Sequence, residues 1–407
     1  MKKFVLGLQH LLAAFGATIL VPLLVGIDPK LALFSAGVGT LIFHICTKMK
    51  VPVFLGSSFA FVAPLITVFT QTGDYAYAAG GSVVAGALYL VFAMIVKIVG
   101  VEKISKLFPP HIVGTMIIII GMTLAPTAVS MASENWIIAL VALSTALLIS
   151  TLTKGFVSNL SVIIGMSVGY IVASLMGEVD FSILKAGSVF AVPEFVIPKF
   201  RLDAILIIAP VVLATFMEHI GDITTNGSVV GKDFVKDPGL HRTLIGDGLA
   251  TMFAGLMGSV PNTTYSENTG VLAITKNYDP RTLRIAAVLA IAFSFFNKAG
   301  LFLQTIPHAV IGGVSFILFG MIASIGVKTL ANSKVNFDNP KVLMIIAVML
   351  TIGLGGVKIT IGNFEMAGVA LSSLVGISLN LILPDELLKK ADKKVKVSDK
   401  KEYIEIK

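Results

Sequence analysis

Residues 258–270 read GSVPNTTYSENTG, a polar stretch containing Pro and Gly in a chain that is otherwise strongly apolar. Residues 51–64, VPVFLGSSFAFVAP, also combine Pro, Gly, small hydroxyl residues and a central aromatic. This composition favours an extended strand followed by a short helix over one continuous helix. We predict that the two segments cross as short antiparallel strands and direct free N–H groups and helix N-termini at a ligand. The alternative is a pair of kinks in ordinary helices.

The rest of the chain has the composition of a membrane protein. It has 407 residues, 56% hydrophobic and 13% charged, with a mean hydropathy of +0.92. Apolar runs of about 20 residues cross a bilayer core of roughly 30 Å as helices. We therefore predict an all-α polytopic membrane protein with fourteen spans. They are residues 4–25, 31–47, 51–70, 77–99, 109–131, 135–153, 157–177, 203–223, 241–259, 260–275, 283–301, 305–326, 341–358 and 364–384. The two broken segments lie in spans 3 and 10.

Charge placement predicts the orientation of these spans. If the N-terminus is cytoplasmic and the spans alternate, most of the 31 Lys and Arg residues fall in cytoplasmic segments. The positive-inside rule then places both termini in the cytoplasm. The net charge of +8 therefore requires no nucleic-acid partner. The first span is too long for a cleavable signal and lacks an A-x-A-like end. Cys46 is the only cysteine and excludes an intrachain disulfide.

Two pairs of similar segments indicate an internal repeat. Residues 109–122, PPHIVGTMIIIIGM, resemble residues 307–321, PHAVIGGVSFILFGM. Residues 154–172 resemble residues 358–379 in the same way. The offset corresponds to seven spans, and an odd number forces opposite orientations, the inverted-repeat plan of secondary transporters. The predicted parts are a first repeat at 1–178, a linker at 179–202, a second repeat at 203–385 and a cytoplasmic tail at 386–407.

Three acidic side chains at membrane depth mark a candidate site. The sequence MEHIGD, residues 217–222, lies in a predicted span, where a charge costs roughly 2.5–3.5 kcal/mol unless it faces a partner or an aqueous cavity. Glu218 and Asp222 share one helical face, and His219 points about 100° away. Glu267 adds a third acid from the broken segment. Clustered acids in low dielectric cannot all be ionised, so we predict that Glu218, Asp222 and Glu267 bind a proton. The alternative is a structural network that caps helix ends, and we interpret His219 as a packing neighbour.

Several motifs of this sequence resemble those of a known family. Residues 267–276, ENTGVLAITK, are similar to the signature of the nucleobase/ascorbate transporters: an acid or Gln, Asn, any residue, Gly, four residues, Thr, then a basic residue or Gly. Further matching segments occur in family order along nearly the whole chain. They are LQHLLAAFGATILVP from Leu8, LGSSFAF from Leu55, EHIG from Glu218, DPGLHR from Asp237 and GSVPNTTYSEN from Gly258.

The resemblance implies a proton-coupled symporter for nucleobases, with uracil as the substrate and Na⁺ as the alternative coupling ion. In this family, spans 1–4 and 8–11 form a core domain and spans 5–7 and 12–14 a gate domain. The third span of each half contains a β-strand. The resemblance further implies alternating access, a homodimer formed through the gate domain and a place in the bacterial cytoplasmic membrane. It implies neither a cofactor nor a metal.

The resemblance also assigns residues. Carried over by motif, the substrate-binding residues are Glu218, Glu267, Phe59, Tyr265, Ser266 and Ala17. The alternation of N–H donors and carbonyl acceptors on the uracil edge suits carboxylates that accept and backbone amides that donate. Two positions depart from the family pattern. Ser266 replaces a Gly, and Asp222 stands where close members place a His believed to join proton coupling, which leaves the route of the proton open.

Several other functions were compared with this prediction. A purine or xanthine permease of the same family commonly has Gln at the position of Glu267. An anion exchanger of the same fold fits badly because the acids would repel its substrate, and a passive channel is a further alternative. An intramembrane hydrolase would use Glu218, His219 and Asp222, but neither an HExxH nor a GxSxG pattern occurs. We therefore expect no enzymatic activity.

Overall fold

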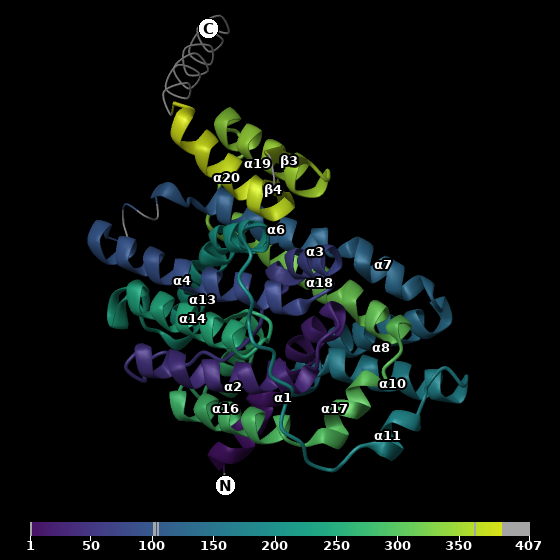
Figure 1. Ribbon diagram of the computed structural model, residues 1–407. Coiled ribbons are helices and arrows are strands. Elements are labelled where there is room, and N and C mark those ends of the chain that lie inside the picture. The colour runs from purple at the N-terminus through teal and green to yellow at the C-terminus, as the bar shows by residue number, and fades with distance from the viewer. Residues whose placement is uncertain (1, 101–102, 104–105, 362–363, 385–407) are drawn as a thin grey trace, which may run out of the picture.

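The computed structural model describes residues 2–100, 103, 106–361 and 364–384, and most of them lie in helices (Figure 1). The predicted tail, residues 386–407, lies outside the described residues, as does the last residue of the predicted second repeat.

Helices dominate the first half of the chain, with one short strand. In order, the elements are α1 Lys2–Val25, α2 Pro29–Cys46, β1 Leu55–Ser57, η1 Phe59–Phe61, α3 Val62–Thr72, α4 Tyr75–Val99, α6 Pro110–Thr123, α7 Ala125–Ser133, α8 Trp136–Leu152, α9 Phe156–Asn159, α10 Ser161–Leu175 and α11 Ser182–Ala186.

The second half has a similar content with two further strands at its end. Its elements are α12 Leu202–Ile208, η2 Ala209–Val211, α13 Val212–Val230, η3 Val235–Gly239, α14 Leu240–Leu256, β2 Asn262–Thr264, α15 Ser266–Thr275, α16 Pro280–Ser294, α17 Asn297–Gln304, α18 His308–Asn332, α19 Pro340–Leu354, β3 Lys358–Ile361, β4 Phe364–Ala367 and α20 Gly368–Ile382.

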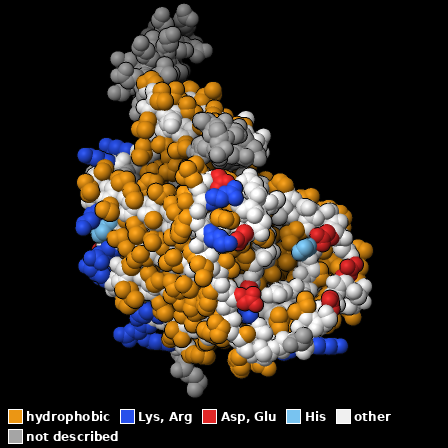
Figure 2. Space-filling model, viewed as in Figure 1, with side chains coloured by type: hydrophobic (Ala, Val, Ile, Leu, Met, Phe, Trp, Pro, Cys, Tyr) orange, Lys and Arg blue, Asp and Glu red, His pale blue; other side chains and the backbone are white. Residues whose placement is uncertain are grey.

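Helix is present in every predicted span, and within the described part of the chain six helical segments are long and apolar enough to cross a membrane. These are Lys3–Val25, Pro29–Cys46, Tyr75–Val99, Pro110–Ser133, Leu202–Val230 and His308–Asn332. Five shorter apolar helices accompany them among the described residues. The count of fourteen spans stays a prediction. Figure 2 shows apolar side chains over much of the visible face, with Lys and Arg gathered along its left edge.

The end of the chain differs from the prediction. Residues 364–367, assigned to a helical span, form β4, which pairs antiparallel with β3 from Lys358↔Ala367 to Ile361↔Phe364. The helix α20 begins only at Gly368. The segment matched to this region in the first half instead contains α9, so the two matched segments differ locally. The prediction of helix from residue 364 was therefore wrong.

Polar residues before proline or apolar runs explain where several helices start. At these N-caps the side-chain oxygen accepts a hydrogen bond from a first-turn N–H that has no partner within the helix. Pro follows directly in three cases, where its fixed φ suits the first helical position. The capping residues are Asp28 of α2, Asp74 of α4, Asn135 of α8, Asp279 of α16 and Asn339 of α19.

The helices pack in two groups. In the first group, α4 packs on α14, α14 on α2 and α2 on α16, as successive layers on the left of Figure 1, and α1, α3, α12, α15 and α17 complete it. In the second group, α18 packs on α6, α7, α8 and α10, while α19 and α20 pack on α6. The helix α13 contacts α4 and α15 of the first group and also α6 and α20 of the second. It therefore lies at the boundary between the groups.

The linker, residues 179–202, runs in a largely extended conformation over the first helix group. Its backbone N–H groups donate to carbonyls at the ends of three elements: Ala191 to Phe295, Val196 to Met257 and Lys199 to Ala76. Apart from α11, it therefore has little regular structure of its own, as the polar, Pro-containing sequence predicts.

The predicted strand pair is confirmed. The strands β1 and β2 are antiparallel, with Leu55 opposite Thr264, Gly56 opposite Thr263 and Ser57 opposite Asn262. All six residues are buried. Ser58 N donates to the carbonyl of Pro261 at 2.9 Å, which extends the pairing by one bond. The two broken segments, far apart in sequence, thus satisfy part of each other's backbone.

Glycine allows close approach within both helix groups. A Cβ built on Gly248 of α14 would lie 2.9 Å from the carbonyl oxygen of Gly86 in α4. A Cβ on Gly326 of α18 would lie 2.5 Å from the carbonyl oxygen of Gly114 in α6. Small residues let membrane helices approach until their backbones touch, and van der Waals packing then stabilises the pair.

We expect Gly326→Ala to destabilise the protein by about 1–3 kcal/mol because the added methyl group overpacks the α6–α18 contact. Gly320→Ala is the matched control on α18, since a Cβ there meets nothing within 4 Å. It should be neutral or stabilise by up to about 1 kcal/mol through helix propensity. Thermal unfolding in detergent measures both, and equal midpoints would contradict the packing argument.

Candidate functional site

The site is built around the strand pair, at the ends where the chain returns to helix. Gly56 Cα packs directly under the Tyr265 ring, since a Cβ on Gly56 would lie 2.3 Å from Tyr265 Cζ. Tyr265 N donates to the Phe54 carbonyl at 3.1 Å, and its hydroxyl donates to the Ser57 carbonyl at 2.9 Å. Tyr265 therefore joins the two broken segments and precedes α15.

Asp222 is held from two sides by hydroxyl groups. Thr264 Oγ1 donates to Asp222 Oδ2 at 2.6 Å, and Ser266 Oγ donates to Asp222 Oδ1 at 2.7 Å. Each carboxyl oxygen of Asp222 thus has one hydroxyl partner. The hydroxymethyl group of Ser266, whose effect the sequence left open, binds Asp222 and ties the start of α15 to α13.

Glu218 and Glu267 lie near Asp222 and its two hydroxyl partners, Thr264 and Ser266, which together are called the clasp. Glu218 is one helical turn before Asp222 on α13, and Glu267 is in the first turn of α15. Both residues are half-buried. Glu218 shares a face of α13 with Asp222, and Glu267 follows Ser266, which binds Asp222. The positive end of the α15 dipole favours a negative charge at Glu267. The structure therefore brings the three predicted acids together.

Phe59 and Ala17 line the same region from other elements. Phe59 begins η1, directly after the paired strand, and its ring contacts the edge of Phe319 of α18 with centroids 5.9 Å apart. Ala17 is buried in α1, next to Thr18, whose carbonyl accepts a hydrogen bond from Ser57 Oγ at 2.9 Å. Phe59 thus spans the boundary between the helix groups.

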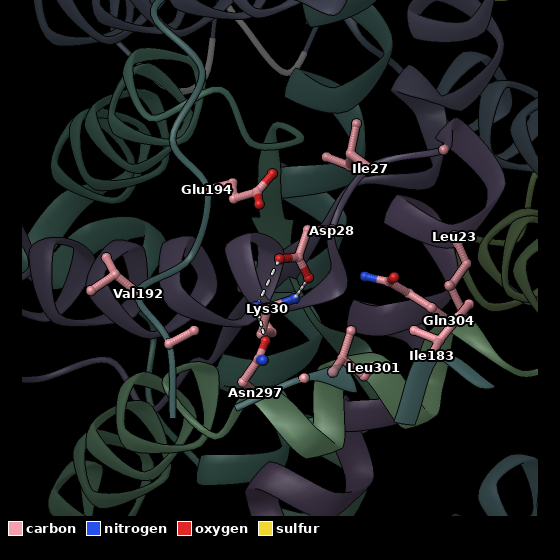
Figure 3. A pocket seen from close by; sticks show the side chains of 13 residues that line it. Leu23, Ile27, Asp28, Lys30, Ile183, Val192, Glu194, Asn297, Leu301 and Gln304 are labelled. Atoms are coloured by element: carbon pink, nitrogen blue, oxygen red, sulfur yellow. Dashed lines mark hydrogen bonds and ion pairs between the residues drawn. The ribbon is translucent and has the colours of Figure 1, made fainter. Parts of the chain in front are cut away.

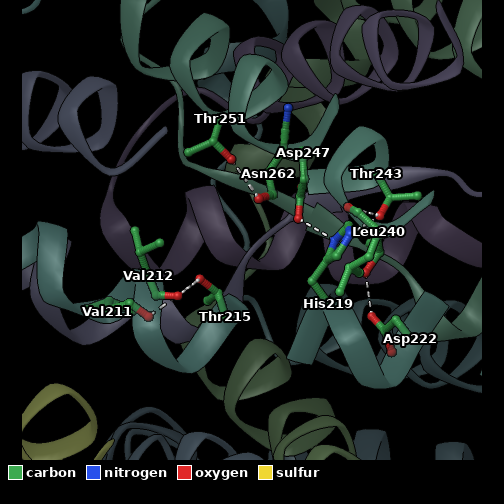
Figure 4. A network of polar contacts seen from close by, with 11 residues as sticks. Val211, Val212, Thr215, His219, Asp222, Leu240, Thr243, Asp247, Thr251 and Asn262 are labelled. Atoms are coloured by element: carbon green, nitrogen blue, oxygen red, sulfur yellow. Dashed lines mark hydrogen bonds and ion pairs between the residues drawn. The ribbon is translucent and has the colours of Figure 1, made fainter. Parts of the chain in front are cut away.

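His219 belongs to a different polar network, and sequence reasoning missed its partner. Figure 4 shows the imidazole between α13 and α14. Its Nδ1 lies 2.8 Å from Asp247 Oδ2, and its Nε2 lies 2.9 Å from Thr243 Oγ1. All three residues are fully buried. The interpretation of His219 as a packed residue agrees with this placement. Asp247 could have been found as a lone acid inside the predicted span 241–259.

The hydrogen bonds of Thr243 determine how many protons this network holds. Thr243 Oγ1 donates its one proton to the Leu240 carbonyl at 2.9 Å, so it must accept from His219 Nε2–H. The contact between His219 Nδ1 and Asp247 therefore requires a second proton, on either residue.

Asparagine side chains bind the broken segments to neighbouring helices. Asn226 of α13 donates to the Pro52 carbonyl at 3.1 Å and to Thr269 Oγ1 at 3.0 Å. Asn262 donates to the Ser35 carbonyl at 3.1 Å, and Asn268 to the His10 carbonyl at 2.9 Å. These bonds hold non-helical backbone in position inside the protein.

Two cavities differ in their relation to the site. The larger, about 750 Å³, is lined in part by linker residues such as Val192 and Glu194 and by no residue of the predicted site (Figure 3). There Lys30 Nζ lies 2.6 Å from Asn297 Oδ1 and 3.2 Å from Asp28 Oδ2. The smaller, about 160 Å³, is lined by Phe59 together with residues of α3, α6, α12 and α20. Among the described residues no group of His, Cys, Asp and Glu could hold a metal ion.

Apolar spans, broken segments paired inside the protein and acidic side chains beside that pair define a class of protein, the membrane transporters. Non-helical backbone and carboxylates at that depth are typical of substrate and ion pathways.

Comparison with known proteins establishes the family. A family model described as the permease family matches residues 1–362, so the chain belongs to this family, the nucleobase/ascorbate transporters. The "Uracil permease" of Bacillus caldolyticus is 46% identical, over 93% of this chain and 91% of its own length. The "Probable uracil permease" of Haemophilus influenzae is 43% identical, over 94% and 95%, respectively. The "Uracil permease" of Escherichia coli K12 is 40% identical, over 93% and 90%. The chain is thus a multi-pass membrane permease and not an enzyme.

Solved structures support the fold alone. The transmembrane domain of the cyanobacterial bicarbonate transporter BicA aligns with a TM-score of 0.61 at 16% identity, over 93% of this chain and 96% of that chain. The SLC26A9 structure aligns with a TM-score of 0.70 at 11% identity, over 93% and 64%. At such identities the substrates of these proteins say nothing about this site.

We expect Thr264→Val to lower the free energy of unfolding by about 1.5–3 kcal/mol, since it removes a hydrogen bond to a charged group. Ser266→Ala should have an effect of the same order. The two changes should be non-additive, because both bonds end on Asp222. Thr151→Val is the control: its hydroxyl donates to a carbonyl of its own exposed helix. If all three variants melt alike, the clasp contributes nothing to stability.

Proposed function

We propose that this permease imports uracil together with a proton. The observation that carries the proposal is the convergence of Glu218 and Glu267 at the point where a paired strand becomes α15. The names of three relatives at 40–46% identity over most of the chain support the same substrate.

The geometry suits the uracil ring. The carboxylates of Glu218 and Glu267 accept from ring N–H groups, while first-turn N–H groups of α15 donate to a ring carbonyl. Phe59 and Tyr265 offer apolar ring faces on either side of the broken segments. A ligand of about eight heavy atoms gains at most about 12 kcal/mol at the observed ceiling of about 1.5 kcal/mol per atom, so nearly every polar atom must be paired.

Proton coupling follows from the charges. Glu218, Asp222 and Glu267 form the coupling cluster, in which Asp222 keeps both oxygens occupied by Thr264 and Ser266. The transported proton binds one member of this cluster, and the charge of the remaining acids favours its uptake. An empty, fully charged cluster is costly to move through a dry barrier, whereas the loaded cluster carries one charge fewer and is less costly to move.

The two helix groups suggest which parts move. We propose that the first group is the core domain and the second the gate domain of an alternating-access transporter, with α13 at their boundary. The cavity of about 160 Å³ beside Phe59 takes walls from both groups and suits an entrance. We further propose fourteen spans in two inverted repeats of seven, both termini in the cytoplasm, a bacterial cytoplasmic membrane and a homodimer formed through the gate domain.

Gradient-driven uptake tests the proposal. Proteoliposomes given an inward proton gradient by a pH jump should accumulate labelled uracil above its external concentration, and a protonophore should abolish the accumulation. Unlabelled uracil should compete better than xanthine or hypoxanthine. Accumulation driven by Na⁺ alone would move the coupling to that ion. Preferential competition by xanthine would establish a purine permease, and equilibration without accumulation would establish a channel.

Glu267→Gln should weaken uracil binding by about 10- to 100-fold, because a charge-assisted hydrogen bond contributes about 1.5–3 kcal/mol. It should also change the pH dependence of uptake, since a titratable member of the cluster is lost. Glu194→Gln, on the exposed linker, is the control and should leave both unchanged. Unaltered uracil affinity in Glu267→Gln would remove this residue from the site.

A further inference from the structure

A third cavity, apart from the site, lies where α1, α10 and α17 meet. It encloses about 320 Å³, and its lining includes Phe15 and Ile19 of α1, Met166 of α10 and Leu303 of α17. Its inner wall is buried: Ile19 is 2% exposed, and Met166 and Leu303 are each 6% exposed. The cavity is therefore a space inside the protein and not a shallow surface depression.

The rim of the cavity is part of the apolar outer surface. Ile171 of α10 is 57% exposed and Phe302 of α17 is 42% exposed, and both line the opening. Leu175, one turn further along α10, is 83% exposed. Large apolar side chains exposed on membrane-spanning helices face lipid. The opening is therefore continuous with the surface that contacts the bilayer.

The polar side chains of the lining have partners within the protein. Ser167 Oγ donates to the Ile163 carbonyl of its own helix at 2.8 Å. Tyr170 Oη lies 2.8 Å from Thr305 Oγ1, and the two hydroxyls bond each other. An occupant therefore finds no side chain that requires a hydrogen bond. A cavity with such walls does not hold water stably.

We propose that the acyl chain of a membrane lipid occupies this cavity. An unfilled void costs the dispersion contacts of its lining atoms. Lipid chains are as apolar as leucine, so the chain is not driven in by the hydrophobic effect but by van der Waals packing, as in membrane helix association. The high local concentration of lipid at the opening favours occupancy by mass action.

The place of the cavity links the lipid to the rest of the fold. The helices α1 and α17 belong to the first helix group and α10 to the second. A relative displacement of the groups changes the volume of the cavity, so an acyl chain binds one arrangement more tightly than another. The lipid then shifts the population of arrangements by that difference in affinity. Binding itself does not depend on which solute the permease carries.

Fluorescence quenching by brominated lipid tests the proposal. The only tryptophan, Trp136, is replaced by Phe, and Phe15→Trp then reports from the cavity wall. The full-length protein is reconstituted in phosphatidylcholine vesicles with or without bromine on the acyl chain. We expect strong quenching of Phe15→Trp, close to that of an Ile171→Trp reporter on the rim. Phe216→Trp, 1% exposed in α13, is the buried control and should be little quenched.

Variants that fill the cavity distinguish an acyl chain that enters the cavity from lipid that only contacts the protein surface. Ser167→Phe places a ring at the opening, and Met166→Phe adds a ring to the wall and serves if the first variant does not fold. Either change should reduce quenching of Phe15→Trp to the level of Phe216→Trp while leaving Ile171→Trp quenched. Quenching of Phe15→Trp that survives both changes, or that is absent from the start, overturns the proposal.

Discussion

The structure depends on one constraint: backbone polar groups at membrane depth must find partners inside the protein. Pairing of β1 with β2 supplies some of them, and side chains supply others. Thr40 Oγ1 accepts from Leu55 N at 2.9 Å, and Asn226 donates to the Pro52 carbonyl at 3.1 Å. Because these bonds come from helices of both halves, the two halves cannot be packed independently. The site lies where the chain is not helical. The hydrogen bonds that satisfy this non-helical backbone also hold the residues of the site in position.

The same constraint explains where the polar side chains around α13 lie. Asn262 and Asn268 of one broken segment and Asn226 of α13 donate to backbone carbonyls and hold the broken segments in position. The His219–Asp247 pair lies buried between α13 and α14. Glu218 and Glu267 are left half-buried at the boundary of the helix groups. Structural polar groups are thus paired in the interior, while the acids proposed to bind substrate keep access to the boundary.

The features that depend on the residue types within a single segment could be predicted from the sequence. Pro, Gly and hydroxyl residues predicted the β1–β2 pair, and acids at membrane depth predicted the cluster of Glu218 and Glu267. The β3–β4 pair was missed because its residues were absorbed into apolar spans, although KITI alternates and Gly-Asn follows, a hairpin signal. Asp247 was missed because it stands alone in its span. The clasp on Asp222 joins residues 42 and 44 positions apart, and no periodicity in one segment reveals such a contact.

That clasp connects the two positions at which the resemblance to the family implies a departure. The resemblance implies a His at the position of Asp222 and a Gly at the position of Ser266, and the structure puts the two side chains in contact at 2.7 Å. A glycine at 266 would leave one carboxyl oxygen of Asp222 without this donor, and an imidazole at 222 would not offer two acceptors to Thr264 and Ser266. The carboxyl group at position 222 and the hydroxyl group at position 266 are therefore chemically matched to each other, and either one alone would lack this partner. Together they place a carboxyl group between two hydroxyls where the resemblance implies an imidazole.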